Sequence, residues 1–89
     1  MTAYEIRFSA RARRAIATEL PEKVAAAALE FILGPLSASP RRVGKPLREP
    51  LAPLWSARRG EYRVTYEILD AVLVVHVVAV VHRRDAYRT

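Results

Sequence analysis

The chain has 89 residues, a length that predicts one small domain spanning 1–89. Apolar residues make up 52%, too many for a disordered basic tail, and 15 Lys and Arg against 9 Asp and Glu give a net charge of +6. There is no cysteine, which excludes disulfides and Cys-ligated metals and is typical of the reducing cytoplasm. The N-terminus lacks the pattern of a signal peptide, and the longest apolar run, Val72–Val81, is about half of a membrane-spanning helix. We therefore expect a soluble cytoplasmic protein that does not enter membranes.

The first part of the chain predicts one strand and two helices. Residues 4–8 alternate between apolar and charged, which is the period of a half-buried strand. Ser9 is a favourable N-cap for a helix over about 10–20, whose apolar residues recur every four positions. Pro21 is suited to the start of a second helix, and Gly34-Pro35 is expected to end it.

The second part predicts a connector and three strands. Five of the six prolines lie within 35–53, which we expect to be mostly extended. A short strand is predicted over 54–58, followed by a turn at Gly60. Residues 62–68 alternate with a period of two, and Val72–His82 is apolar almost throughout, as in a central strand covered on both faces. The order β-α-α-β-β-β predicts an α+β domain, with an antiparallel-rich sheet packed against a two-helix hairpin.

The positive charge is concentrated in the second half of the chain. Residues 1–40 hold five basic and four acidic residues, whereas 41–89 hold ten basic and five acidic, a net of +5. Nine of those ten are Arg, whose planar guanidinium binds phosphate through two parallel hydrogen bonds. A polyanion is the expected partner, although a solvated surface explains any single Arg as well. The residues that we expect to contact nucleic acid are Arg11, Arg14, Arg41, Arg42, Arg48, Arg58 and Arg59.

Two positions carry a more specific signal. Arg63 alternates with Tyr62 and Val64, so its guanidinium emerges in the middle of a sheet; a structural pair with Glu67 is the alternative. The C-terminal segment 82–88 brings a His, several Arg and a Tyr to the end of the last strand. Such groups can transfer protons at a phosphate while Arg stabilises the developing charge. The alternative is a basic chain end whose Tyr is docked on the core.

Other catalytic patterns are missing from the sequence. There is no Gly-rich phosphate loop, no Gly-x-Ser-x-Gly elbow, and no His or carboxylate cluster with metal-ligand spacing. An enzyme of this sequence is therefore predicted to use no metal and no cofactor.

The chain resembles the RelE/ParE superfamily of bacterial toxins, and within it the RelE type. The resemblance spans nearly the whole chain and rests on the element order and on the segments Arg42–Arg48, Leu54–Tyr66 and His82–Arg88. It implies a ribosome-dependent endoribonuclease that cuts mRNA in the A site, where the RNA 2′-OH attacks the adjacent phosphate. It also implies a RelB-like antitoxin as the protein partner.

The resemblance also implies roles for single residues. By position, Arg63 matches the Arg that contacts the scissile phosphate, Arg83 a second Arg, and Tyr87 a C-terminal Tyr that acts in proton transfer or base stacking. His82 stands where relatives have Lys or His. Lys45 completes the catalytic set that we predict.

One departure leaves the acid and base roles open. The best-known relatives carry a Lys pair where this chain has Leu54 and Ser56. Candidates to supply that charge are Lys45, Arg48 and Arg58, and the alternatives for the general base are Glu61 and His82.

Two other functions compete with the nuclease. A ParE-type toxin on the same fold inhibits DNA gyrase without cleaving RNA, and fold does not determine function. The presence of both Arg positions and the Tyr favours the nuclease. A plain nucleic-acid-binding module is the third possibility, but no pattern for a DNA-reading helix is present.

Overall fold

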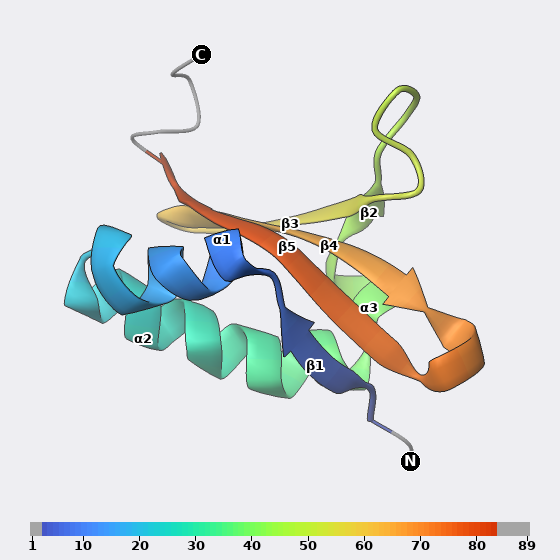
Figure 1. Cartoon of the computed structure of the whole chain (residues 1–89), viewed down its shortest axis with the longest axis horizontal. Helices are drawn as coiled ribbons and strands as arrows, with labels where there is room; N and C mark the ends of the chain where they lie inside the picture. Colours follow the sequence, from blue (N-terminus) through green and yellow to red (C-terminus); the bar gives the residue numbers. More distant parts are fainter. Residues whose placement is uncertain (1–2, 84–89) are drawn as a thin grey trace.

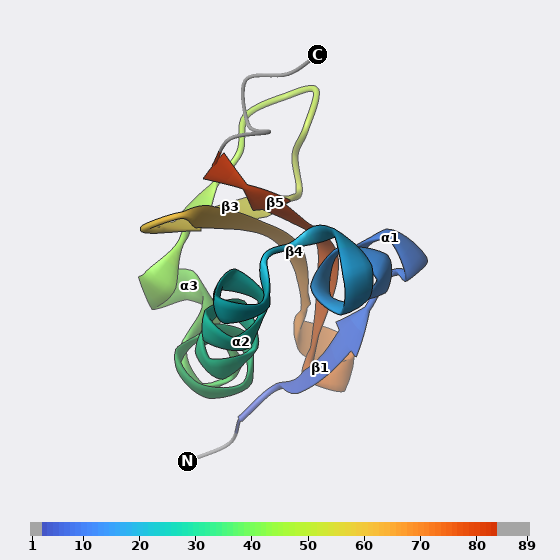
Figure 2. The ribbon, with the colours of Figure 1, turned by 90° about the vertical axis from the view of Figure 1, so that its left-hand side faces the viewer.

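The structure, a computed structural model, describes residues 3–83. It contains one mixed β-sheet with helices packed on a single face (Figure 1, Figure 2). The strand order is β1-β5-β4-β3-β2, with β1 parallel to β5 and every other pair antiparallel. The predicted α+β fold is confirmed; β5 lies inside the sheet between β1 and β4, and β4 is the central strand. In chain order the elements are β1 (Glu5–Phe8), α1 (Ala10–Arg14), η1 (Ala15–Glu19), α2 (Glu22–Phe31), η2 (Ile32–Leu36), α3 (Pro40–Val43), β2 (Lys45–Pro46), β3 (Trp55–Arg59), β4 (Tyr62–Leu69), η3 (Asp70–Val72) and β5 (Val74–His82).

The first helical segment forms as the sequence predicts. The Ser9 hydroxyl accepts the backbone N–H of Ala12 at 3.0 Å, so it caps α1, and the π-helical turn η1 continues the segment until Leu20 is extended.

The second helical segment does not end at Gly34-Pro35, as expected. The π-helical turn η2 carries the chain through both residues, and such a turn tolerates the missing N–H of Pro35. Burial favours the continuation, because Leu36 has no exposed surface and Ser37 forms two hydrogen bonds with Tyr4. Tertiary contacts here outweigh the local stop signal.

The proline-rich stretch 35–53 is also more structured than predicted. Pro40 occupies the first turn of α3, a position where its missing N–H costs nothing, and Lys45–Pro46 pairs with β3 as strand β2. The loop 47–54 joins β2 to β3 and rises on the side of the sheet opposite the helices (Figure 2).

The core lies between the helices and one face of the sheet. On β4 the predicted alternation is confirmed: Tyr62, Val64 and Tyr66 are buried, while Arg63, Thr65 and Glu67 are partly exposed. Helices cover only one face of β5, not both as expected (Figure 2). The other face of the sheet, called the open face below, positions the candidate site. The fully buried large side chains are Tyr66, Ile32, Leu36, Val64, Val75 and Val77.

A basic groove on the open face of the sheet

Strand register gathers cations on the open face. Residues directly opposite each other in an antiparallel pair have side chains on the same face. Arg63 of β4 is opposite Arg58 of β3 on one side and Val81 of β5 on the other. Two residues before Arg58 in β3, Ser56 is opposite Lys45 of β2. Arg63, Arg58 and Lys45 therefore all lie on the face away from the helices.

These residues border an open groove of about 520 Å³. Five of the residues around it are cations, and none of those that the structure places there is acidic. Such a concentration of positive charge attracts a polyanion and favours binding of its phosphates. The lining residues are Arg42, Val43, Gly44, Lys45, Leu47, Ser56, Arg58, Arg59 and Arg63.

A tight turn brings the two central arginines together. Gly60, with a φ of +51°, and Glu61 connect β3 to β4 as a two-residue turn, and glycine adopts this positive φ without strain. The turn fixes the register in which Arg58 and Arg63 are opposite each other. Like charges in directly opposed positions repel, so this pair lowers the stability of the fold.

Arg59 takes part in the structure as well as in the groove. Its guanidinium lies 4.6 Å from the centre of the Phe31 ring and donates to the Val43 carbonyl at 3.4 Å. These contacts tie β3 to α2 and to the end of α3. Arg59, predicted to contact RNA, thus also contacts α3, the helix that carries Arg42.

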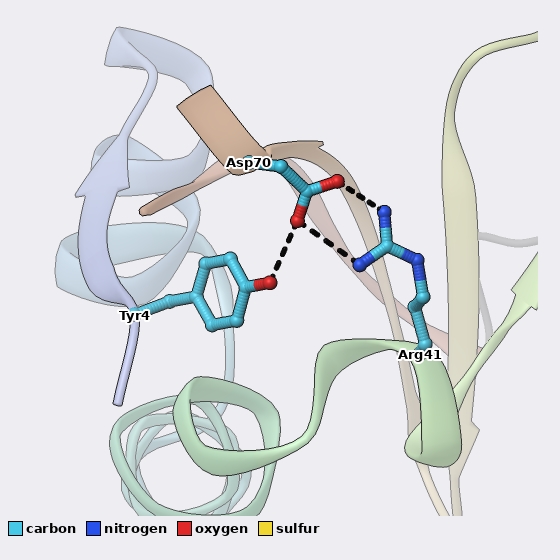
Figure 3. Close-up of polar contacts among 3 residues, drawn as sticks. All are labelled: Tyr4, Arg41 and Asp70. Carbon is cyan, nitrogen blue, oxygen red and sulfur yellow. Dashed lines mark hydrogen bonds and ion pairs between the residues drawn. The ribbon is translucent and has the colours of Figure 1, made fainter. Parts of the chain in front are cut away.

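Arg41, another predicted RNA contact, is engaged elsewhere. Its guanidinium donates to both carboxylate oxygens of Asp70, to Oδ1 at 3.0 Å, and the Tyr4 hydroxyl donates to Oδ1 at 2.7 Å (Figure 3). The hydrogen bonds from Arg41 and then Tyr4 lower the pKa of Asp70 to about 2. The hydrogen bond to Asp70 raises the pKa of Tyr4. This cluster joins α3 to η3 and to the start of β1, and Arg41 does not line the groove.

A bulge in β5 places His82 away from the groove. Thr65 is opposite Ala79 but Tyr66 is opposite Val77, so Val78 is an extra residue in β5. One extra residue turns the side chains of all later residues of the strand to the opposite face of the sheet. His82 is therefore opposite Tyr62, on the helix side, where it lines a separate cavity of about 270 Å³. The structure does not bring His82 together with Arg63.

The remaining predicted residues are dispersed. Arg11 borders the same separate cavity as His82, Arg14 is exposed on α1, and Arg48 is exposed in the loop 47–54. Arg83 is exposed directly after β5, where its backbone N–H donates to the Glu61 carbonyl at 2.6 Å, beside the β3–β4 turn. Tyr87 lies outside the described residues.

The sequence reasoning missed the apolar and small members of the groove. Val43, Gly44, Leu47 and Ser56 line it, and Ser56 was noted only as a departure from relatives. The signal for Ser56 was available, because it alternates with Ala57 and so shares a face with Arg58.

Within residues 3–83 there is neither a metal-ligand cluster nor a membrane-spanning helix. In that part of the chain no group of three or more His, Asp or Glu side chains is placed to hold a metal ion. No helix within it has the length and apolar character to cross a membrane.

Comparison with known proteins relates the whole chain to toxins. Residues 3–87 match the family described as the ParE toxin of the type II toxin-antitoxin system parDE. The chain is 49% identical over 85 residues to Toxin RelG of Mycobacterium tuberculosis, covering 96% of this chain and 97% of that protein. It is 47% identical over 85 residues to Toxin RelE of the same organism, covering 96% and 87%.

Solved structures share the fold. The toxin–antitoxin complex RelBE2 from Mycobacterium tuberculosis contains a chain that superposes with a TM-score of 0.89 at 48% identity, covering 92% of this chain and 100% of that one. A double arginine-to-alanine mutant of the E. coli toxin RelE in the free state gives a TM-score of 0.74 at 22% identity, covering 96% and 88%, a likeness of fold.

Proposed function

Because the chain belongs to the ParE toxin family of type II toxin–antitoxin systems and is a RelE-type toxin, we propose that it is an endoribonuclease that cuts mRNA in the ribosomal A site. Residues 1–89 act as one toxin domain. The observation that carries the proposal is the groove of about 520 Å³ surrounded by five cations, of which Arg63, Arg58 and Lys45 lie on the open face. A groove of this charge fits an RNA backbone.

The proposed reaction uses a nucleophile that the RNA itself contains. The 2′-OH oxygen attacks the adjacent phosphorus and the bond from phosphorus to the 5′ oxygen breaks, which leaves a 2′,3′-cyclic phosphate and a 5′-OH. The 2′-OH gives up its proton, and the leaving oxygen receives one. Negative charge grows on the non-bridging oxygens during the attack. Preorganised donors aimed at such charge are the largest contribution that an enzyme makes to this kind of step.

Arg63 is the residue that we assign to the scissile phosphate. It is half-buried in mid-sheet and lines the groove, and the planar fork of Arg can donate two hydrogen bonds to one phosphate. Arg58 lies directly opposite Arg63, Lys45 lines the same groove from β2, and both supply further positive charge. Arg42 and Arg59 are suited to neighbouring phosphates. We assign His82 no role in the reaction, because its side chain lies on the helix side of the sheet.

Arg83 and Tyr87 complete the proposed site. Arg83 begins beside the β3–β4 turn, at the end of the sheet that carries Arg63. We assign Arg83 to the phosphate and Tyr87 to proton transfer or base stacking, as in the family whose pattern they match.

The proposed partners are an antitoxin and the ribosome. Structural relatives at 48% and 23% identity were solved as RelB–RelE complexes, which supports a RelB-like antitoxin for this chain. A partner that silences the toxin has to neutralise the groove, so we expect it to bring negative charge. Translating ribosomes supply the mRNA in the proposed reaction.

The test is primer extension on a defined mRNA, with and without translating ribosomes. Wild type should cut only with ribosomes, and Arg63→Ala should lower the rate about 10²–10³-fold. Arg7→Ala is the matched control, because Arg7 is also a sheet arginine but is exposed and paired with Glu5 on β1, at the opposite edge of the sheet from β2. Cuts on free RNA would remove the ribosome from the proposal. An unchanged rate in Arg63→Ala would remove Arg63 from the site.

A second function is favoured by the family match. The matched family is described as a ParE toxin, and a ParE-type toxin acts on DNA gyrase without cleaving RNA. Folded, antitoxin-free protein that leaves mRNA intact but causes broken DNA to accumulate would establish this second function.

A further inference from the structure

One wall of the groove is formed by α3 and β2, and these elements are too short to fix their own positions. It consists of a helix of four residues, Gly44, and a strand of two residues. Yet it carries Arg42 and Lys45, two of the cations around the groove. Their positions must therefore be fixed by contacts from other elements.

Tyr66 of β4 makes the most buried of these contacts. Its side chain has no exposed surface, and its hydroxyl donates to the Pro40 carbonyl, the first residue of α3, at 2.6 Å. The Trp55 ring stacks beside it, with centroids 6.5 Å apart and planes 27° from parallel. The hydrogen bond of this hydroxyl links the sheet to the wall through a single acceptor, the Pro40 carbonyl.

Gly44 leaves the space that the Tyr66 hydroxyl occupies. A Cβ on Gly44 would lie 2.1 Å from the Tyr66 hydroxyl oxygen and 2.8 Å from the Ser56 carbonyl oxygen. The φ of Gly44 is −137°, which any residue adopts, so the requirement for glycine comes from this close approach alone. The hydroxyl is thus enclosed by Gly44 on one side and bonded to Pro40 on the other.

We propose that Tyr66 is a positioning residue for the basic groove: its hydroxyl, fitted against Gly44 and bonded to Pro40, sets where α3 and β2 present Arg42 and Lys45. The inference rests on the proposed function, because it assigns those two cations to RNA phosphates. Tyr66 touches no substrate in this role. It acts through the backbone of the wall.

Tyr66→Phe is the test, and the chain provides a matched control. Tyr62→Phe removes a hydroxyl from the same face of the same strand, where Tyr62 is also buried, but this hydroxyl donates to Ala27 of α2 at 3.2 Å, away from the wall. A misplacement near 1 Å costs about 10²-fold in rate. We expect Tyr66→Phe to lower kcat for mRNA cleavage by roughly 10- to 100-fold. Tyr62→Phe should cleave at the wild-type rate.

A double-mutant cycle separates positioning from a loss of stability. Gly44→Ala forces the wall away from the Tyr66 oxygen and should lower cleavage more than Tyr66→Phe does. In the double variant that oxygen is gone, so cleavage should recover above that of Gly44→Ala, although the Ser56 carbonyl keeps the recovery partial. Independent effects would instead multiply. Multiplication in folded variants would overturn the inference.

Amide exchange tests the wall without RNA. The Leu47 N–H, one residue beyond β2, donates to the Leu54 carbonyl at 2.8 Å. Its exchange should accelerate in Tyr66→Phe and not in Tyr62→Phe. If wild type does not cleave mRNA, the proposed function fails while exchange still decides whether Tyr66 holds the wall. Wild-type exchange in Tyr66→Phe, or faster exchange with wild-type cleavage, contradicts the positioning role.

Discussion

Removing the charge of one of the two opposed arginines in the groove should stabilise the fold while it lowers the proposed cleavage activity. Arg58 and Arg63 are directly opposite each other across β3 and β4, on the open face. No acidic residue lines the groove among those described, so no carboxylate there offsets the repulsion. We expect Arg63→Gln, which keeps most of the side chain and loses the charge, to have a larger free energy of unfolding than wild type.

The size of the gain follows from the geometry. Directly opposed Cβ atoms lie about 5 Å apart, and two long side chains that lean away from each other reach roughly 8 Å between charges. At that distance the repulsion is about 0.5 kcal/mol in bulk water and about 1 kcal/mol at half the dielectric constant of water. A gain of about 0.5 kcal/mol raises the Tm of a domain of this size by roughly 2–4 °C.

Urea unfolding at two salt concentrations measures the effect. At about 20 mM salt the Debye length is roughly 20 Å and the gain should be complete; at about 0.5 M it falls to roughly 4 Å and most of the gain should disappear. Arg7→Gln is the control, because Arg7 loses an ion pair with Glu5 at 2.9 Å and should not be stabilised. In a double-mutant cycle, Arg58→Gln should add nothing from this pair once Arg63 is neutral. A less stable Arg63→Gln at low salt would refute the repulsion.

Three further predictions concern the scaffold. The folded pKa of Asp70, about 2, lies below its ordinary 3.8, so its ion pair stabilises the fold above pH 3.8 and less as the pH falls toward 2. The advantage of wild type over Asp70→Asn in urea unfolding should therefore shrink across that range; a constant advantage would contradict it. Leu73 has a φ of +53°, a strained conformation for leucine that costs about 1 kcal/mol, and its side chain is 44% exposed. Leu73→Gly should therefore unfold at equal or higher urea, and a clear loss of stability would show that its apolar contacts dominate. Arg59→Ala loses the contact with the Phe31 ring and should cost about 0.5–1 kcal/mol by the same assay, whereas no change would assign Arg59 to the groove alone.

The fold was largely predictable because its signals are local and agree with one another. Residues 62–68 alternate cleanly, and the structure buries one set of that alternation. Ser9 caps the first helix as its side chain predicts. The expectations that were wrong, at Gly34-Pro35 and across 35–53, concern places where distant contacts decide. Burial of Leu36 and the pairing of Lys45 with Ser56 cannot be read from the segment itself.

The candidate site was predictable for single residues but not for their grouping. The period of two places Arg63 on the open face without any knowledge of its neighbours. That Arg58 and Lys45 join it depends on strand pairing. His82 shows the limit most clearly: in an apolar run such as β5, alternation is invisible, so the bulge at Val78 that turns His82 to the other face leaves no trace in the sequence.

The repulsion between Arg58 and Arg63 also provides a test of RNA binding in the groove that does not depend on cleavage. An anion that binds the folded chain and not the unfolded one adds RT ln(1 + [L]/Kd) to the free energy of unfolding, about 2.7 kcal/mol at a hundred times Kd. Filling the groove with RNA phosphates also removes the repulsion between Arg58 and Arg63, so a short RNA oligonucleotide should raise the Tm of wild type more than that of Arg63→Gln. Equal shifts in both would mean that the oligonucleotide binds elsewhere on this basic surface. The order of the two shifts thus locates the bound RNA even if cleavage requires the ribosome.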